Sequence, residues 1–288
     1  MPTSNRVRIW SAVALIGVAF VVLYSRVFLK LVDAWTNDGN YSHGFLIIPL
    51  AAYLAWERRD QLAAAPLRRS VLGALLVVAS VGVLGLGVLG SELFLTRLSM
   101  IGVITGIVLF MLGWSHLRIL VFPLSMLLLM IPIPAIIFNQ IAFPLQLLAS
   151  RFGESVLSAA SIPVLREGNV LILANTTLEV AEACSGIRSL ISLLTLGIVF
   201  GYFTDRRVWV RTLIAASTVP IAIVANGLRV AGTGIAAHHI GPAAAEGFFH
   251  EFSGWVVFVV AFGMLMVMQR AVARFVPTPQ PQPTALAA

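Results

Sequence analysis

Apolar runs, each about as long as a bilayer is thick, recur along this chain from residue 9 to residue 268. An α-helix rises about 1.5 Å per residue, so roughly 20 residues cross a hydrocarbon core about 30 Å thick. Backbone polar groups inside that core must be hydrogen-bonded within the segment, and a single run achieves this as a helix. We therefore predict eight membrane-spanning helices, at residues 9–29, 35–56, 71–90, 98–114, 117–134, 185–203, 208–230 and 252–268.

The composition of the chain agrees with a membrane protein. Hydrophobic residues make up 59% of the 288 residues and charged residues 11%, whereas soluble domains average about 45–50% and about 25%. The first run, at residues 9–29, is longer than the core of a signal peptide and is followed by no small-residue cleavage pattern, so we expect a retained span. The predicted fold class is an all-α membrane protein, a polytopic bundle of about eight transmembrane helices.

The positions of the basic residues predict the orientation of the chain. Lys and Arg outnumber Asp and Glu by 19 to 12, and they cluster in short polar breaks, which is typical of membrane topology and not of a nucleic-acid surface. If the breaks alternate between inside and outside, most of the basic residues fall inside: Arg6, Arg8, Arg58, Arg59, Arg68, Arg69, Arg118, Arg206, Arg207, Arg211, Arg270 and Arg274. Both termini are therefore predicted to be cytoplasmic.

Two segments differ from the spans. Residues 135–162 have apolar positions at helical spacing, which predicts helices on the outer membrane surface or packed over the bundle. Residues 164–184 alternate apolar and polar side chains around turn candidates at 167–169 and 174–175, which predicts a small extracytoplasmic β-hairpin before the sixth span. We interpret residues 1–275 as one polytopic membrane domain and residues 276–288 as a disordered, proline-rich cytoplasmic tail.

Cys184 is the one cysteine of the chain, and it stands where the predicted hairpin enters the sixth span. A helix N-terminus carries about half a positive charge, which favours thiolate over thiol, and such positions lower a thiol pKa from its usual value of about 8.5. The small neighbours in "ACSG" leave the sulfur accessible. Cys184 is thus a candidate nucleophile, although a lone cysteine in an apolar chain is also typical of a buried small residue.

A cation and an imidazole are predicted at the same membrane surface as the thiol. Arg229 lies about 27 Å along a helix from the cytoplasmic Arg211, which is close to one hydrocarbon thickness. His250 stands at the start of the eighth span, after a predicted outer loop. A thiol, a base and a cation can perform acyl transfer: the imidazole accepts the proton, the thiolate attacks a carbonyl, and the guanidinium stabilises the oxyanion.

The residues alone leave alternatives open. Arg188 follows Cys184 by four residues, on the same face if both are helical, and is a rival to Arg229. Other residues on the predicted outer side could supply the base or orient it: His43, His238, His239 and Glu182. The adjacent histidine pair lacks a third and fourth ligand at a recognisable spacing, so we predict no metal and no cofactor.

Four stretches of the sequence, taken together, resemble the exosortase family: "YSHGFLIIPLAAYLAWERR", "EACSGIRSL", "NGLRVAGTG" and "HEFSGW". The resemblance implies an eight-span bacterial inner-membrane cysteine protease and transpeptidase, similar in function to sortases and unrelated to them in fold. It implies that Cys184 is the nucleophile, with Arg229 and His250 as the family's arginine and histidine, and it leaves Arg188 a supporting role. The "YSHG" stretch, which contains His43, matches a family signature without an assigned chemical role.

The resemblance also implies partners and a location. Substrates would be exported proteins with a C-terminal sorting signal, composed of a Pro-Glu-Pro motif, one transmembrane helix and an arginine-rich cytoplasmic tail. The enzyme would lie in the lipid bilayer of the bacterial inner membrane with its active site facing the periplasm, and would bind no nucleic acid. From another function class, a multi-pass transporter or exopolysaccharide-export component with a structural cysteine fits the same spans.

Overall fold

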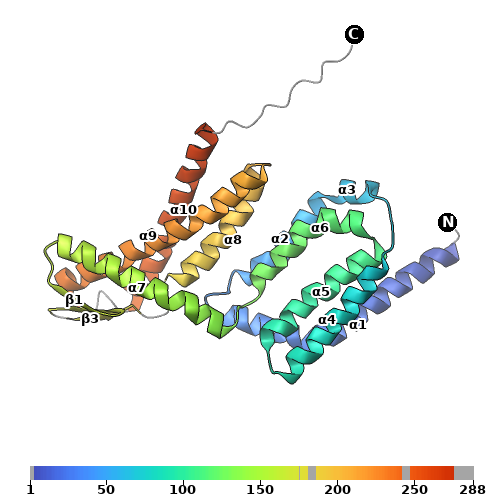
Figure 1. Cartoon of the computed structure of the whole chain (residues 1–288), viewed down its shortest axis with the longest axis horizontal. Helices are drawn as coiled ribbons and strands as arrows, with labels where there is room; N and C mark the ends of the chain where they lie inside the picture. Colours follow the sequence, from blue (N-terminus) through green and yellow to red (C-terminus); the bar gives the residue numbers. More distant parts are fainter. Residues whose placement is uncertain (1–2, 175, 181–185, 242–246, 276–288) are drawn as a thin grey trace, which may run out of the picture. The chain divides into compact units, whose positions relative to one another are not determined.

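The computed structural model of the chain describes residues 3–174, 176–180, 186–241 and 247–275; at residues 3–10, 12 and 247–251 it describes the backbone alone. The chain forms two compact units, Met1–Ala135 and Ile136–Ala288, both made mainly of helices (Figure 1). The prediction of an all-α, multi-pass membrane protein with a small β insertion is confirmed. The predicted tail at 276–288 lies outside the described ranges.

The first unit contains α1 (Thr3–Asn37), α2 (Gly44–Glu57), α3 (Arg59–Ala64), α4 (Val71–Leu89), α5 (Leu93–Met111), α6 (Trp114–Met126) and the 3₁₀ helix η1 (Leu127–Met130). Helices α4 and α5 form a hairpin and lie side by side (Figure 1). The Glu92 carboxylate accepts a hydrogen bond from the Phe94 amide (3.0 Å), which caps the start of α5. Helix α1 contacts α5 through the hydroxyls of Tyr24 and Ser99, which are 3.1 Å apart.

Glycines let the backbones of α4 and α5 approach each other closely. A Cβ atom at Gly73 would overlap the backbone nitrogen of Phe110 and would lie 2.7 Å from the carbonyl oxygen of Gly106. Small residues at helix interfaces are a main source of association between spans, because packing replaces the hydrophobic effect inside lipid. The contact between α4 and α5 therefore requires that residue 73 have no side chain.

We expect Gly73→Ala to destabilise the protein by about 1–3 kcal/mol, since α5 must move to admit the added methyl group. Gly82 lies on the same helix with no atom within 4 Å of the position of its missing Cβ. Gly82→Ala is therefore the matched control, and it should leave stability unchanged or raise it slightly. Thermal unfolding of both variants in detergent measures the difference, and equal midpoints would contradict the packing argument.

The number of spans differs from the prediction. Within the described ranges, six helices are long and apolar enough to cross a membrane, and a seventh is reached if Trp114–Met130 and Ala135–Ala159 form one broken span. The predicted second span is interrupted by a turn, which leaves α2 with 14 residues. The turn forms because Asp38 Oδ1 accepts a hydrogen bond from the Asn40 amide (2.8 Å), a bond that Asp side chains readily make.

The second unit contains nearly all of α7 (Ala135–Ala159), then β1 (Val164–Glu167), β2 (Val170–Leu173), β3 (Thr177–Glu179), α8 (Ile187–Thr204), α9 (Val208–Ile240) and α10 (Gly247–Phe275). The strands form an antiparallel sheet in the order β1-β2-β3. The β1–β2 turn contains Gly168 at φ +65°, a conformation that glycine adopts without strain. The predicted hairpin is confirmed, and a third strand pairs with it. Asn175, in the second predicted turn, lies outside the described residues.

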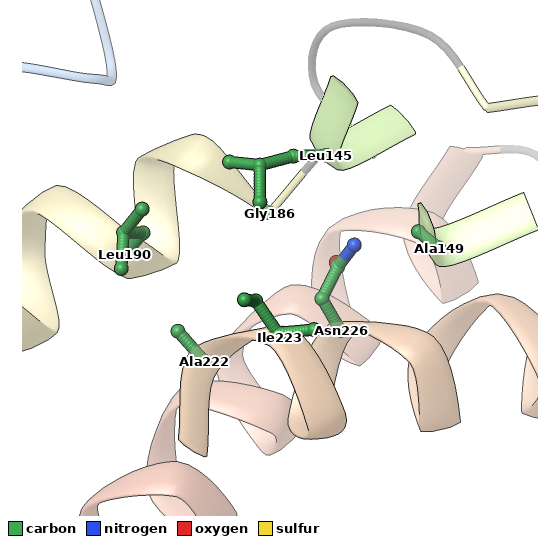
Figure 2. Close-up of a pocket in the computed structure, with 7 residues that line it drawn as sticks. All are labelled: Leu145, Ala149, Gly186, Leu190, Ala222, Ile223 and Asn226. Atoms are coloured by element: carbon green, nitrogen blue, oxygen red, sulfur yellow. The ribbon is translucent and has the colours of Figure 1, made fainter. Parts of the chain in front are cut away.

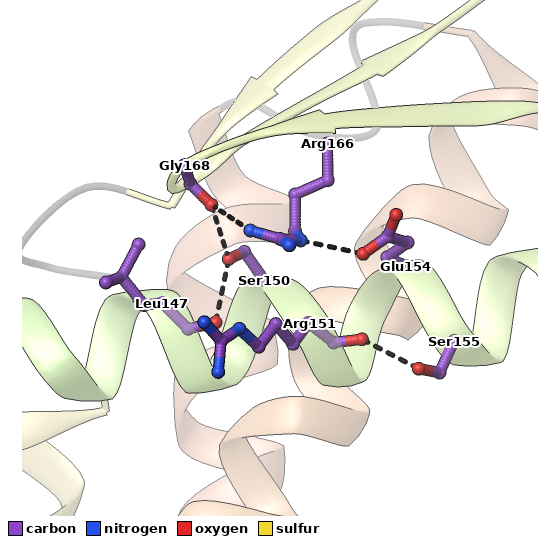
Figure 3. Close-up of polar contacts among 7 residues, drawn as sticks. All are labelled: Leu147, Ser150, Arg151, Glu154, Ser155, Arg166 and Gly168. Atoms are coloured by element: carbon purple, nitrogen blue, oxygen red, sulfur yellow. Dashed lines mark hydrogen bonds and ion pairs between the residues drawn. The ribbon is translucent and has the colours of Figure 1, made fainter.

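Helix α7 holds the sheet through polar contacts (Figure 3). The buried Ser150 hydroxyl donates to the carbonyl oxygen of Gly168 in the β1–β2 turn (3.0 Å). Arg166 of β1 donates from Nε to Glu154 Oε2 (2.7 Å) and from Nη1 to the same carbonyl (3.0 Å). The segment predicted as surface helices is thus one helix, α7, which is hydrogen-bonded to the sheet.

Helices α8, α9 and α10 share one core. Leu193, Ile214 and Leu265, one from each helix, are fully buried. At Gly197 of α8 a Cβ atom would overlap the Thr218 side chain of α9, so these two helices pack closely.

Helix α9 extends ten residues beyond its predicted end, into the predicted outer loop. The extension buries Ala231, Gly234 and Ala237, which recur at helical spacing. Gly234 lies against Leu157 of α7, since a Cβ there would be 2.9 Å from a leucine methyl group. Packing against α7 therefore explains why this segment is helical.

The turn between α8 and α9 is closed by Asp205. Its carboxylate accepts hydrogen bonds from the Arg207 amide (2.7 Å) and from Arg207 Nη2 (2.7 Å), and its carbonyl oxygen accepts one from Arg211 Nε. The hydrogen bonds from Arg207 hold the pKa of Asp205 below its ordinary value, because they favour the ionised carboxylate. The turn contains Arg206 and Arg207, and the first turn of α9 contains Arg211; all three are among the arginines that predict the cytoplasmic side.

Candidate active site

Arg229 links α9 to the first turns of α10. Its Nε donates a hydrogen bond to Ser253 Oγ (3.0 Å), and its side chain is partly buried. The next residue of α10 is Gly254, where a Cβ atom would lie 3.5 Å from Arg229 Nη2, so the guanidinium lies against the backbone of α10. His250 precedes Ser253 by three residues in the same helix, which puts both on one helical face. Arg229 therefore contacts the turn of α10 that follows His250.

The start of α8 packs against α9 one turn before Arg229. Gly186 has φ +81°, and helix α8 begins at the next residue. A Cβ atom at Gly186 would lie 2.6 Å from Cγ and 2.9 Å from Nδ2 of Asn226, and Asn226 is only 2% exposed. Glycine is required at residue 186 both by the left-handed backbone and by this contact. Since Asn226 and Arg229 are three residues apart on α9, both project from the same side of that helix.

A narrow pocket lies beside the contact between Gly186 and Asn226 (Figure 2). It is lined by Leu145 and Ala149 of α7, Gly186 and Leu190 of α8, and Ala222, Ile223 and Asn226 of α9. Its volume of about 10 Å³ is close to the smallest space that holds one water molecule. Asn226 is the one polar side chain among these lining residues.

The structure brings some of the predicted site residues together and does not describe others. Arg229 lies on α9, and His250 lies on α10. The hydrogen bond from Arg229 to Ser253 joins these two helices near the backbone of His250. Cys184 and Glu182 lie outside the described residues, as does the His250 side chain. The described residue closest in sequence to Cys184 on the α8 side is Gly186, two positions later.

Arg188 lies in the first turn of α8, with an exposed side chain. The sequence argument placed it on the same helical face as Cys184, four residues earlier. That argument does not apply, because α8 begins at Ile187 after a residue with φ +81°. The i, i+4 rule holds only when both residues belong to one continuous helix.

His43 belongs to the first unit, where the "YSHG" stretch holds an irregular backbone segment. His43 Nε2 donates to the carbonyl oxygen of Leu129 (3.1 Å), and the Tyr41 hydroxyl accepts from the Ile133 amide (3.2 Å). Trp35 Nε1 donates to the carbonyl of Met130 (2.9 Å), and its indole fills the space that a side chain at Gly44 would occupy. The bonds to Leu129 and Met130 satisfy carbonyl groups that the end of η1 leaves without helical partners, so the hydrogen bond of His43 lies within the first unit.

The adjacent histidines of the predicted outer loop lie in the last turn of α9. Their rings, at His238 and His239, are 5.0 Å apart. In the ranges that the structure describes, no group of three or more His, Cys, Asp or Glu residues is arranged to hold a metal ion.

Asn226 and Ser253 are residues of this region that the sequence analysis did not select. Both fall inside quoted motifs, "NGLRVAGTG" and "HEFSGW". Asn226 precedes Arg229 by three residues, and Ser253 follows His250 by three. Helical spacing from the selected residues was therefore a signal that could have identified them.

Comparison with known proteins identifies one family. The family model described as transmembrane exosortase (Exosortase_EpsH) matches residues 35–267, which is most of the chain. No curated protein and no solved structure matches the chain.

Proposed function

This chain belongs to the transmembrane exosortase family, and on that premise we propose that it is a membrane-embedded cysteine protease and transpeptidase. It cleaves the C-terminal sorting signal of exported proteins through an acyl-enzyme on Cys184, with Arg229 and His250 as the other reacting groups. The observation that supports the proposal is the hydrogen bond from Arg229 to Ser253 (3.0 Å). That bond joins the family's arginine to the helical turn next to the family's histidine.

The start of α8 gives a second line of support. Gly186 contacts Asn226, which lies on α9 one turn before Arg229. Residues two apart in a chain have α-carbons at most about 7 Å apart. Gly186 follows the proposed nucleophile by two positions in the sequence, and its contact with α9 supports the proposal that Cys184 acts together with Arg229.

The proposed reaction is acyl transfer in two steps. The imidazole of His250 accepts the thiol proton, and the thiolate of Cys184 attacks the scissile carbonyl carbon, whose oxygen takes the displaced electron pair. The guanidinium of Arg229 stabilises that oxyanion. As the intermediate collapses, the C–N bond breaks and the imidazolium gives its proton to the leaving amine. Water or an amine acceptor then attacks the thioester and releases Cys184.

The proposed substrates are exported proteins whose sorting signal consists of a Pro-Glu-Pro motif, one transmembrane helix and an arginine-rich tail. The substrate helix enters from the lipid, and its motif reaches Cys184 just outside the hydrocarbon core. This arrangement requires the enzyme to lie in the bacterial inner membrane with both termini in the cytoplasm and its active site facing the periplasm. The arginine-rich turn at 205–207, about 30 Å along α9 from Arg229, agrees with this orientation.

The test is processing of a tagged substrate in bacterial cells. An exported protein with the full sorting signal should lose its C-terminal tag when this chain is co-expressed, and should keep it in cells without the enzyme. The control substrate has the Pro-Glu-Pro motif replaced by three alanines and should stay intact. If the two substrates are the same size in the presence of the enzyme, the protease assignment fails and the transporter alternative is favoured.

A further inference from the structure

The sheet of the second unit has an open edge at β3. Beside this strand, the Val180 amide donates a hydrogen bond to the Asn169 carbonyl (2.9 Å), so these two residues form a bonded pair of the β2–β3 ladder. Bonded and non-bonded pairs alternate along an antiparallel ladder. In the observed register, Leu178 is therefore bonded to β2, whereas Thr177 and Glu179 are not. The N–H and C=O groups of Thr177 and Glu179 point away from β2, towards the free edge.

These outward backbone groups are accessible. Thr177 and Glu179 are exposed, and on the free edge their backbones form no hydrogen bond with a described residue. Two positions along a strand span about 7 Å, which is the repeat of any other extended backbone. The edge therefore matches an extended polypeptide, whose N–H and C=O groups recur at the same spacing.

The opposite edge of the sheet, at β1, is less accessible. By the same alternation, the outward backbone groups of β1 belong to Val164 and Arg166. Both residues are only partly exposed, and Arg166 is held against α7 by its hydrogen bond to Glu154 (2.7 Å). Of the two edges, β3 is the more open to another chain.

The end of β3 lies near the part of α9 that carries Arg229. Val180, the residue after the strand, is buried in one cluster with Leu171 of β2 and Val230 of α9. A Cβ atom at Gly153 of α7 would lie 2.8 Å from a methyl carbon of Val230 and 3.2 Å from a methyl carbon of Leu171, so these two side chains are neighbours. Val230 directly follows Arg229. A chain bound along β3 would therefore lie near the arginine of the candidate active site.

The charge at this edge restricts what can bind there. Glu179 is exposed on the outer face of the sheet, in one cross-strand row with Val170 and Glu167. Within the part of the chain that the structure describes, Glu179 forms no ion pair. Like charges directly opposite each other destabilise strand pairing, and opposite charges stabilise it. The edge therefore favours a segment with a basic or neutral residue opposite Glu179.

We propose that the free edge of β3 binds the substrate, by pairing with an extended stretch of the exported protein as an added strand of the sheet. This inference rests on the proposed function and adds the way in which the substrate is held. The amides of Thr177 and Glu179 donate to carbonyl oxygens of the substrate, and their own carbonyl oxygens accept from its amides. Backbone bonds supply affinity in such pairing, and neighbouring side chains supply specificity. Because β2 already holds β3 on its other side, the edge is preorganised for binding.

The first test changes the ligand and leaves the edge intact. A labelled peptide with the sorting motif is bound to the full-length Cys184→Ser variant in detergent, and each N–H of the peptide is replaced in turn by N–CH₃. Every second N–H of an extended segment faces the same edge. The Kd should therefore rise about tenfold at two positions that are two residues apart, and little at the position between them. Equal effects at consecutive positions, or no effect anywhere, would overturn the proposal.

Thr177→Pro changes the edge of the enzyme. Proline removes the outward N–H and puts its ring on the free edge, while the ladder to β2 keeps its bonds. Peptide binding should weaken about tenfold or more. Thr177→Val is the matched control, since it keeps the N–H and the side-chain shape, and it should change the Kd less than about twofold. If Val164→Pro, at the opposite edge, weakens binding and Thr177→Pro does not, the substrate binds β1 and the proposal is wrong.

The charge of Glu179 supplies a third arm of the test. One of the two positions that the N-methyl scan identifies lies opposite Glu179. A lysine at that position should bind about two- to fivefold more tightly than a glutamate, and Glu179→Gln should remove most of the difference. Equal affinities of the lysine and glutamate peptides at both positions would contradict the proposal.

A second copy of this chain is the alternative occupant, since open strand edges also pair with each other. Light scattering of the protein in detergent distinguishes the two cases. If Thr177→Pro converts a dimer to a monomer and leaves peptide binding unchanged, the edge is a contact between copies and the proposal is overturned. Failure of the proposed function has a different signature: Cys184→Ser would then still process the substrate in cells, whatever the N-methyl scan shows.

Discussion

Replacing Cys184 with serine should lower the rate of sorting-signal cleavage by at least roughly 10⁴-fold, since loss of a nucleophile removes the covalent route altogether. A serine hydroxyl is close in size to the thiol, but it stays protonated at neutral pH and needs a stronger base to attack a carbonyl. Because the chain has one cysteine, no other thiol can replace it.

The measurement is the size shift of a tagged substrate in cells, together with trapping of the thioester by hydroxylamine. Wild-type enzyme should give a hydroxylamine-sensitive adduct between enzyme and substrate, and Cys184→Ser should give neither the adduct nor the shift. Thr218→Val, at a buried position outside the candidate site, controls for folding and for the level of protein in the membrane. Normal processing by Cys184→Ser would identify the cysteine as structural and would favour a transporter.

Replacing Arg229 with lysine should slow acylation about 10²–10³-fold, although the positive charge is kept. The guanidinium has several N–H donors in a fixed plane, and its Nε donates a hydrogen bond to Ser253 Oγ (3.0 Å). A lysine ammonium is a single point charge and cannot hold the Ser253 bond and the substrate oxygen in the same geometry. The effect should therefore appear in kcat more than in KM.

Arg188→Lys is the control for this prediction, because Arg188 was the rival cation in the sequence. It lies exposed in the first turn of α8, and its replacement should change acylation less than about threefold. Single-turnover acylation with the same peptide measures both variants. If Arg188→Lys is the slow variant and Arg229→Lys is not, the roles of the two arginines are reversed and Arg229 is a structural contact of α10.

Much of the fold could be predicted from local properties of the sequence. The run predicted at 71–90 is the helix Val71–Leu89, and the run predicted at 185–203 is Ile187–Thr204. The agreement arises because an apolar backbone in lipid must form its own hydrogen bonds, so the length and hydropathy of a run decide its structure. The β1–β2 turn was predicted for the same kind of reason, since Gly168 adopts positive φ without strain.

The predictions that failed depended on packing between distant segments. Residues 231–240 were predicted as part of an outer loop, yet they continue α9 and bury Gly234 against Leu157. The predicted second span is interrupted by a turn at Asp38 and Asn40. Hydropathy averaged along a run does not register either effect.

For this protein, the sequence by itself determined the membrane class and most of the spanning helices, and it predicts Arg229 and His250 as candidate site residues within their motifs. These follow from side-chain type and spacing along one segment. Only the tertiary structure decided that Arg229 bonds to a serine 24 residues away on α10, and that Asn226 of α9 faces Gly186 of α8. The physical reason is that close contacts between helices depend on which faces pack together, and local hydropathy leaves that choice open.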